Sequence, residues 1–133
     1  MSPVQQILAA LHQKPVAFYP LYRHLMESTA GGLILSQLMF KFSSAGHEGF
    51  FYTDQDIFSA TGVTPHELRQ AKERLKALPF IELSLKGVPA QTWWEIDWEI
   101  YETYVGSFLE GKPLPQFGEA LQTGLEKLSK LYR

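Results

Sequence analysis

The sequence predicts a mostly α-helical fold with one small β-hairpin. Apolar residues recur at helical spacing in several separate stretches, and prolines or glycines stand where those stretches end. Two short apolar runs, residues 80–85 and 92–96, flank the tip Lys86-Gly87-Val88-Pro89, which is typical of a β-hairpin. No internal repeat is found, so we expect a single domain over residues 1–133.

Length and composition agree with a folded domain. The chain has 133 residues, of which 45% are hydrophobic and 20% are charged, an ordinary globular composition. The absence of cysteine excludes disulfides, thiolate metal sites and a cysteine nucleophile, and it suits the reducing cytoplasm. Neither a basic leader nor an apolar run of ~20 residues is present, so we expect a cytoplasmic protein without a signal peptide or membrane segment.

The N-terminal half is expected to be built around one strongly apolar helix. Ser28 and Thr29 offer a cap for this helix, which covers residues 30–42. It is apolar around most of its girth, so we expect it at the centre of the core. The other elements expected here are a helix over residues 4–11, a β-prone run over 16–19, helical turns over 21–26, a loop over 43–49 and a strand over 50–52.

Two helix starts are clear between residues 53 and 65. Thr53 caps a helix over residues 54–60, and Gly62 follows where a left-handed residue is commonly needed. The next helix, residues 65–78, has Thr64 as N-cap, a proline at its first position and a glutamate that completes a capping box. Pro79 blocks its continuation. After the hairpin and Asp97 we expect a helix with an aromatic face, a linker over residues 111–115 and a last amphipathic helix over 117–132.

The order of these elements is that of a winged helix-turn-helix. Helix, short strand, helix, glycine turn, helix and hairpin follow one another over residues 30–97. We therefore expect a winged helix-turn-helix core with additional N- and C-terminal helices, residues 98–133 forming a C-terminal helical extension. This fold predicts that five apolar side chains are buried together: Leu33, Leu38, Leu68, Leu75 and Ile81.

Several motifs also resemble a known group. They are Phe18-Tyr19-Pro20, Leu33-Ile34-Leu35-Ser36-Gln37-Leu38, Gly49-Phe50-Phe51-Tyr52, Thr61-Gly62-Val63-Thr64, Arg69-Gln70-Ala71-Lys72-Glu73-Arg74-Leu75 and Lys86-Gly87-Val88-Pro89-Ala90 followed by a strand and Asp97. In this order, over roughly residues 18–97, the sequence resembles the N-terminal winged-helix domain of phage replication proteins of the replisome-organiser type, related to DnaD-type primosomal proteins. The resemblance implies DNA binding in replication. The chain departs from the group at Pro79, where a glycine is common, and in a less basic hairpin.

The helix over residues 65–78 carries the residues expected to contact DNA. Its polar face lies opposite Leu68, Ala71 and Leu75, and the second helix of a helix-turn-helix presents such a face to the major groove. Arginine pairs with guanine, glutamine pairs with adenine, and lysines contact phosphates. A phosphate can also bind at the helix N-terminus, and the hairpin tip would reach the backbone or minor groove. The expected DNA-binding residues are Thr64, His66, Arg69, Gln70, Lys72, Glu73, Arg74, Lys76 and Lys86.

The local charge favours DNA binding by residues 64–88, but the small number of cations limits its strength. Residues 64–88 carry five Lys or Arg and three Glu, a local charge of +2 in a chain whose total is −2. The simplest alternative is that these charges form only the solvated face of an amphipathic helix. Phosphate contacts supply most non-specific DNA affinity, and this chain has few cations for them.

The sequence therefore leads to one main functional hypothesis and one alternative. The main hypothesis is a DNA-binding protein of phage or plasmid type, acting on double-stranded DNA in replication initiation or transcriptional regulation. The alternative is a protein–protein adaptor that uses the same scaffold, with an aromatic, acidic C-terminal surface. A homodimer and a replication or transcription protein as partner are compatible with both.

Catalysis, metal binding and cofactor binding are not expected. The four histidines are dispersed, and Asp54 and Asp56 lie at a helix start, where the helix dipole explains them. No phosphate loop or nucleophile motif is present. Trp93 and Trp94 alternate on a strand, so one is expected in the core. The other is expected under the C-terminal helices or, with Trp98, in a subunit interface.

Overall fold

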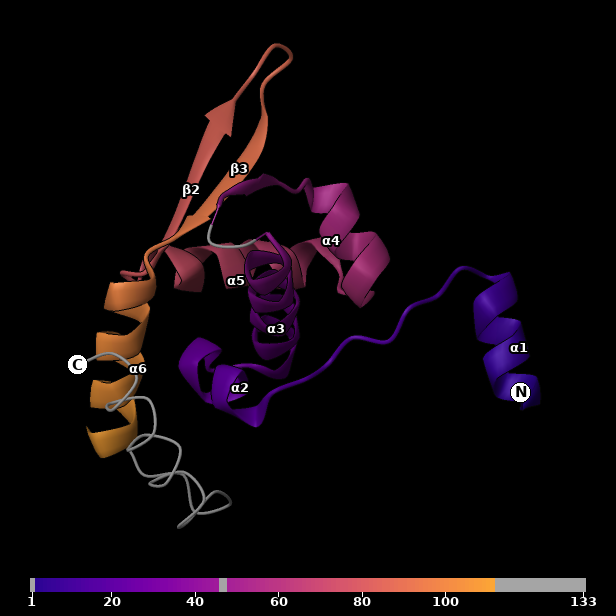
Figure 1. The fold of residues 1–133 in the computed structure, drawn as a ribbon, viewed down its shortest axis with the longest axis horizontal. Coiled ribbons are helices and arrows are strands. Elements are labelled where there is room, and N and C mark those ends of the chain that lie inside the picture. Colours follow the sequence, from indigo (N-terminus) through magenta and orange to yellow (C-terminus); the bar gives the residue numbers. More distant parts are fainter. Residues whose placement is uncertain (1, 46–47, 112–133) are drawn as a thin grey trace. The chain divides into compact units, whose positions relative to one another are not determined.

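The computed structural model describes residues 2–45 and 48–111. The chain forms two compact units, Met1–Ile96 and Asp97–Arg133. The described residues contain six helices and three short strands, so the mostly helical fold with a small β-structure is confirmed (Figure 1). That residues 1–133 fold as one domain stays a prediction. None of the helices in the described residues has the length and apolarity needed to span a membrane.

The first helix, α1 (Pro3–Ala10), forms from local signals alone. Ser2 and Gln5 make a capping box, and proline occupies the first turn. No residue of α1 is buried, and its apolar side chains Val4, Ile7 and Leu8 are exposed. Local capping has therefore defined a helix without tertiary burial.

The predicted β-prone run over residues 16–19 is wrong as a strand. This segment pairs with none of the strands in the described residues. Instead, the Tyr19 N–H donates to Ser36 Oγ at 3.1 Å, and the Ser36 hydroxyl donates to the Gly32 carbonyl at 2.7 Å. A buried serine of a helix thus takes the hydrogen bond that a neighbouring strand would have taken.

Helices α2 (Pro20–Met26) and α3 (Thr29–Ser44) pack closely against each other. A Cβ added to Gly32 would lie 2.6 Å from the Arg23 Cα, so glycine is required at this approach. Ser28 caps α3 by accepting the Gly31 N–H at 2.9 Å, as its sequence indicated. The loop expected from Ser43 is wrong at its start, because α3 continues through Ser44, whose hydroxyl donates to the Phe40 carbonyl.

Helix α3 supplies the centre of the core, as predicted. Its side chains with almost no exposure include Ile34, Leu35, Leu38 and Phe42. The expectation that Leu33 is buried is wrong, since this side chain is only half-buried. Position 33 lies on the flank of the helix, and the nearly all-apolar sequence has no polar stripe that would have revealed this.

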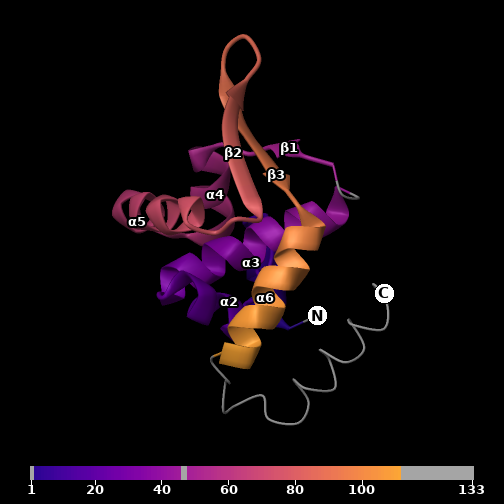
Figure 2. The same ribbon diagram turned by 90° about the vertical axis from the view of Figure 1, so that its left-hand side faces the viewer.

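The sheet has three short antiparallel strands in the order β1-β3-β2. They are β1 (Phe50–Phe51), β2 (Ile81–Lys86) and β3 (Gln91–Ile96). Trp94 pairs with Phe50 on one side and Leu83 on the other, and its indole N–H donates to the Tyr52 carbonyl at 2.9 Å. Ile81 is half-buried and not part of the core as expected, because β2 is an edge strand. In Figures 1 and 2 the β2–β3 hairpin projects away from the helices of its unit.

Helices α4 (Asp54–Thr61) and α5 (Pro65–Lys76) lie between β1 and β2 in the chain. Helix α5 packs against α3 and buries Leu68, Ala71 and Leu75. It ends two residues before the predicted Leu78, because the N–H groups of Ala77 and Leu78 bond to carbonyls three residues back. This tighter turn is common at helix ends and leads into the sheet.

The second unit is described over α6 (Trp98–Gly111). Asp97 Oδ1 accepts the Ile100 N–H at 3.0 Å, which starts the helix where it was predicted. The rings of Trp98 and Tyr101 meet edge to face, with centroids 5.6 Å apart. The predicted linker over residues 111–115 is wrong at its start, because α6 includes Gly111. Its other residues and the predicted helix over residues 117–132 lie outside the described residues.

Candidate nucleic-acid interface

Two capping boxes and one glycine orient α5. Thr53 and Asp56 exchange hydrogen bonds at the start of α4, and Thr64 and Glu67 do the same at the start of α5. Between them, Gly62 has φ 74° in the left-handed region, and its N–H donates to the Phe58 carbonyl. The predicted caps Thr53 and Thr64, the capping box at Thr64 and Glu67, and the left-handed Gly62 are confirmed.

Helix α5 has one buried and one exposed face. Leu68, Ala71 and Leu75 form the buried face, each at most 3% exposed. The eight candidate residues at the N-cap and in α5 divide into two groups by exposure. Lys72 and Arg74 are half-buried; Thr64, His66, Arg69, Gln70, Glu73 and Lys76 are exposed. The exposed group therefore provides most of the surface on which α5 could contact a ligand.

Three of the exposed side chains form a polar triplet: His66, Arg69 and Gln70. Their spacing of three and four residues places them on neighbouring turns of one helix face. None of the three makes a hydrogen bond or an ion pair with another described residue. The triplet can therefore bind a ligand without breaking an internal contact.

Lys72 and Arg74 instead contact other helices. Lys72 Nζ forms an ion pair with Asp54 Oδ1 of α4. Arg74 Nε donates to the Leu25 carbonyl of α2 at 2.9 Å, and Arg74 Nη2 lies 3.6 Å from Glu27 Oε1. These two cations join α5 to its neighbours, so the protein itself already uses their hydrogen-bonding groups.

Lys76 has a weaker internal partner. Its Nζ lies 3.2 Å from Glu73 Oε1, one turn earlier on the same helix. Both side chains are about two-thirds exposed or more, at 66% and 72%. Exposed pairs of this kind contribute little to stability, so the lysine can exchange this partner for another.

The hairpin residue Lys86 belongs to a cluster with Trp93 and Glu95. Lys86 Nζ lies 3.4 Å from Glu95 Oε1 and 4.7 Å from the centroid of the Trp93 ring. The Trp93 indole N–H donates to the same carboxylate at 2.6 Å. This hydrogen bond, followed by that from Lys86, lowers the pKa of Glu95.

The two adjacent tryptophans have different environments, as predicted. Trp94 is fully buried in the core. Trp93 is half-buried between Lys86 and the ring of Phe51, whose centroid is 4.7 Å away. A Cβ on Gly49 would lie 2.6 Å from Trp93 Cζ2, so this glycine lets the chain pass close to the indole. Residues of the first unit thus cover part of Trp93; a subunit interface at Trp93 and Trp98 stays a prediction.

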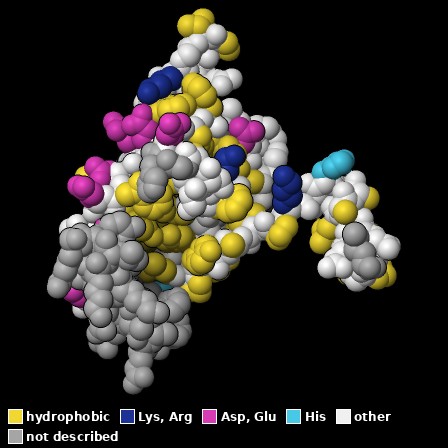
Figure 3. Space-filling model, viewed as in Figure 1, with side chains coloured by type: hydrophobic (Ala, Val, Ile, Leu, Met, Phe, Trp, Pro, Cys, Tyr) yellow, Lys and Arg dark blue, Asp and Glu magenta, His cyan; other side chains and the backbone are white. Residues whose placement is uncertain are grey.

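The long-range carboxylate partners are what sequence reasoning missed. Of the five cations in residues 64–88, four lie within 4 Å of a carboxylate oxygen: Lys72, Arg74, Lys76 and Lys86. Only the Glu73–Lys76 spacing was readable as a local pair. On the face shown in Figure 3, acidic side chains lie beside the basic one at the hairpin, and no continuous basic patch is visible.

Comparison of the chain with protein-family models, curated proteins and solved structures found no match. Its function is therefore inferred from its own residues. Across the part of the chain that the structure describes, no three His, Asp or Glu side chains gather closely enough to hold a metal ion. The polar triplet and the hairpin are the features that bear on nucleic-acid binding.

Proposed function

We propose that the first unit is a winged helix-turn-helix domain that binds double-stranded DNA. In this proposal α5 is the recognition helix and the β2–β3 hairpin is the wing. The chain order α3-β1-α4-α5-β2-β3 and the sheet order β1-β3-β2 support it. The observation that carries it is the exposed, unpaired triplet His66, Arg69 and Gln70 on the helix that follows the glycine turn.

The triplet has the chemistry of base recognition. Arg69 can donate two hydrogen bonds to guanine O6 and N7, and Gln70 can pair with adenine through its amide. Thr64 is exposed at the N-terminus of α5, where the helix dipole favours a phosphate. In this proposal the triplet of α5 recognises the DNA bases. The first turn of α5 and the wing contact the DNA backbone and position the protein on it.

The ion pairs imply weak non-specific binding. Lys72, Arg74 and Lys86 would each have to leave or share a carboxylate to neutralise a phosphate. The logarithm of affinity falls with the logarithm of salt by about 0.9 for each phosphate neutralised. We therefore propose a DNA-binding protein with a shallow salt dependence, acting without catalysis in phage- or plasmid-type replication initiation or transcriptional regulation.

Selection of binding sites from a random duplex library, at two salt concentrations, tests this function. Arg69→Ala and Gln70→Ala should each weaken the selected site by ~1–3 kcal/mol, the value of one base contact. Arg23→Ala is the matched control, since Arg23 is an exposed cation of α2 with no carboxylate partner among the described residues. Failure to select any sequence, or equal losses in all three variants, would contradict the proposal.

A protein–protein adaptor is the second candidate. It is favoured by the paired cations and by the exposed apolar side chains of the hairpin, where Leu85 is 73% and Val88 103% exposed. A partner held through such side chains should respond little to salt, whereas DNA binding should weaken as salt rises. Salt-independent capture of a protein, together with no selected DNA, would assign the adaptor function.

A further inference from the structure

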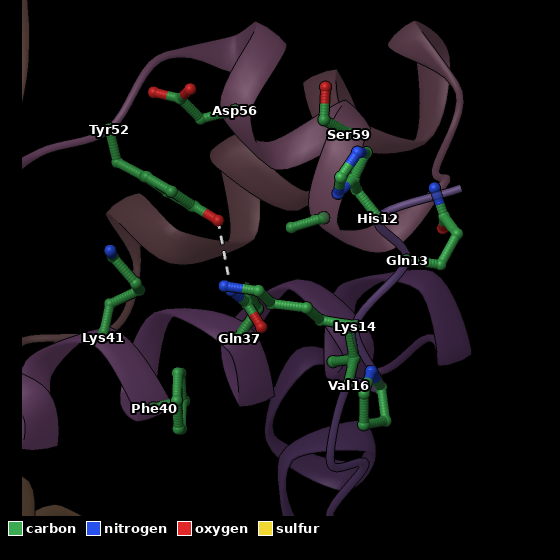
Figure 4. A pocket seen from close by; sticks show the side chains of 12 residues that line it. His12, Gln13, Lys14, Val16, Gln37, Phe40, Lys41, Tyr52, Asp56 and Ser59 are labelled. Atoms are coloured by element: carbon green, nitrogen blue, oxygen red, sulfur yellow. Dashed lines mark hydrogen bonds between the residues drawn. The ribbon is translucent and has the colours of Figure 1, made fainter. Parts of the chain in front are cut away.

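A pocket with both polar and apolar walls lies on the first unit, and its lining does not include the candidate DNA-binding residues. It is lined by linker residues 12–16 and by residues of α3, α4 and the β1–α4 connection, and its volume is about 390 Å³ (Figure 4). Small-molecule sites are clefts of roughly 300–1,000 Å³ with a few convergent polar groups.

Unpaired positive charge is concentrated at this pocket. Of the eight Lys and Arg in the described residues, four have a carboxylate within 4 Å and four do not: Lys14, Arg23, Lys41 and Arg69. Two of those four, Lys14 and Lys41, line the pocket. In Figure 4 they enter from opposite sides, one from the linker and one from α3.

Aromatic rings hold the Lys41 ammonium in place. Its Nζ lies 5.2 Å from the centroid of Tyr52 and 5.9 Å from that of Phe50. A cation over ring faces is stabilised without being neutralised, so its charge remains available to an anion.

The Tyr52 hydroxyl adds a directed donor. Gln37 Nε2 donates to Tyr52 Oη at 3.1 Å, and the Tyr52 O–H has no acceptor among the described residues (Figure 4). Burial raises the pKa of Tyr52, with a smaller lowering effect from Gln37, so the hydroxyl keeps its proton at neutral pH. This proton can be donated to an anionic oxygen in the pocket.

The remaining lining residues indicate what else a ligand of this pocket should carry besides an anionic group. Asp56 is the carboxylate of the lining, and it accepts the Thr53 N–H at 2.8 Å as part of the α4 cap. Pro15, Val16 and Phe40 provide apolar surface beside the donors, and Phe40 is 61% exposed. The lining therefore matches a ligand with two parts. One is an anionic group that the two lysines and the tyrosine can bind, and the other is a flat apolar group that can pack on the apolar residues.

We propose that this pocket binds a small phosphate ester that carries a flat ring, of the nucleoside monophosphate class. The phosphate is bound by Lys14, Lys41 and the Tyr52 hydroxyl, and the ring packs on Phe40 and the linker. Arginine and lysine bind phosphate through charge-assisted hydrogen bonds, and aromatic side chains stack on bases. This site is independent of DNA binding by α5.

Thermal unfolding and amide NMR of the full chain test the pocket, with AMP, inorganic phosphate and adenosine as separate probes. AMP should raise Tm in a saturable way and shift the amide signals of the pocket. Inorganic phosphate and adenosine, which each carry one part of AMP, should produce smaller effects. AMP that acts no more strongly than inorganic phosphate or adenosine would overturn the proposal.

Variants locate the site. Lys41→Met keeps the apolar stem over the rings and removes the charge, and Lys14→Gln changes an exposed linker residue that cannot unfold the core. Each should weaken AMP binding about tenfold, as expected for loss of a charge-assisted hydrogen bond. Arg23→Gln, an unpaired cation outside the pocket, should leave AMP binding unchanged. Parent-like AMP binding by Lys14→Gln and Lys41→Met would contradict the assignment.

Discussion

The cations of α5 lie in two regions of the helix surface, one facing other helices and one facing solvent. The sequence alone does not distinguish them. Lys72 and Arg74 are half-buried and bond to α4 and α2, whereas Arg69 is exposed and makes no hydrogen bond or ion pair with another described residue. The difference comes from partners that are 18 and 49 residues away in sequence. Adjacent residues of one charge type can therefore serve the fold and a ligand surface separately, and only tertiary contacts distinguish them.

This difference changes how a basic stretch is interpreted. A local charge of +2 suggests a surface for phosphates, but the ion pairs already satisfy most of its cations. Interaction with DNA would then depend on a few base contacts more than on overall attraction. The inward-facing side of α5 should control stability, and the outward-facing side should control binding.

The largest effect is expected from the buried face. Leu68→Ala should destabilise the protein by ~2–5 kcal/mol, because Leu68 is 2% exposed and its removal leaves a cavity beneath α5. Urea unfolding of this variant, beside Arg69→Ala as an exposed control on the next residue, measures the contrast. Arg69→Ala should cost under ~0.5 kcal/mol. Comparable losses in both variants would mean that α5 does not divide into these two faces.

Arg74→Met should have the next largest effect. Methionine retains packing along the stem but leaves the Leu25 carbonyl without its donor, so a loss of ~1–2 kcal/mol is expected. The carbonyl belongs to a residue that is fully buried. DNA affinity, measured below the unfolding temperature, should stay near that of the parent. If Arg74→Met weakened DNA binding without changing stability, Arg74 would belong to the outward-facing region.

Lys72 and Lys76 provide a finer comparison. Lys72→Ala should cost under ~1 kcal/mol, since its side chain is 25% exposed in the ion pair, and Lys76→Ala should cost less because its pair is more exposed. For DNA, Lys76→Ala should weaken all sequences alike, as loss of a phosphate contact does, whereas Lys72→Ala should change DNA affinity little because Lys72 is held by Asp54. Thermal unfolding and binding at two salt concentrations report the two properties. A larger stability loss in Lys76→Ala would reverse the order proposed here.

The fold could be predicted where local signals decide it. The capping residues Thr53 and Thr64, the left-handed Gly62 and the hairpin were all readable, because each depends on neighbours within a few residues. The errors concern long-range contacts. The β-prone run at residues 16–19 bonds to a helix serine, and Leu33 lies on the flank of a helix whose sequence is apolar on almost every side.

The residues of the candidate site could be predicted from the sequence, but their hydrogen-bond and ion-pair partners could not. Spacing identified the exposed face with Arg69 and Gln70 and the buried leucines opposite. It could not show that Arg74 reaches a carbonyl of α2, since that requires the packing of both helices. It also gave no indication of the pocket, because Lys14 and Lys41 come from segments that only the fold brings together.

The smallest predicted effect is a pH dependence at the hairpin. The pKa of Glu95 is lowered from its ordinary value of 4.5, first by the Trp93 indole N–H and then by Lys86. A carboxylate with a lowered folded-state pKa contributes stability that is present above the unfolded pKa and is lost as pH falls through the folded pKa. The stability difference between parent and Glu95→Gln should therefore be constant near neutral pH and shrink below about pH 4.5. Because the indole is the first cause, Trp93→Phe should remove more of this pH dependence than Lys86→Met. The opposite order, measured by unfolding at a series of pH values, would show that the hairpin carboxylate responds to charge rather than to the indole hydrogen bond.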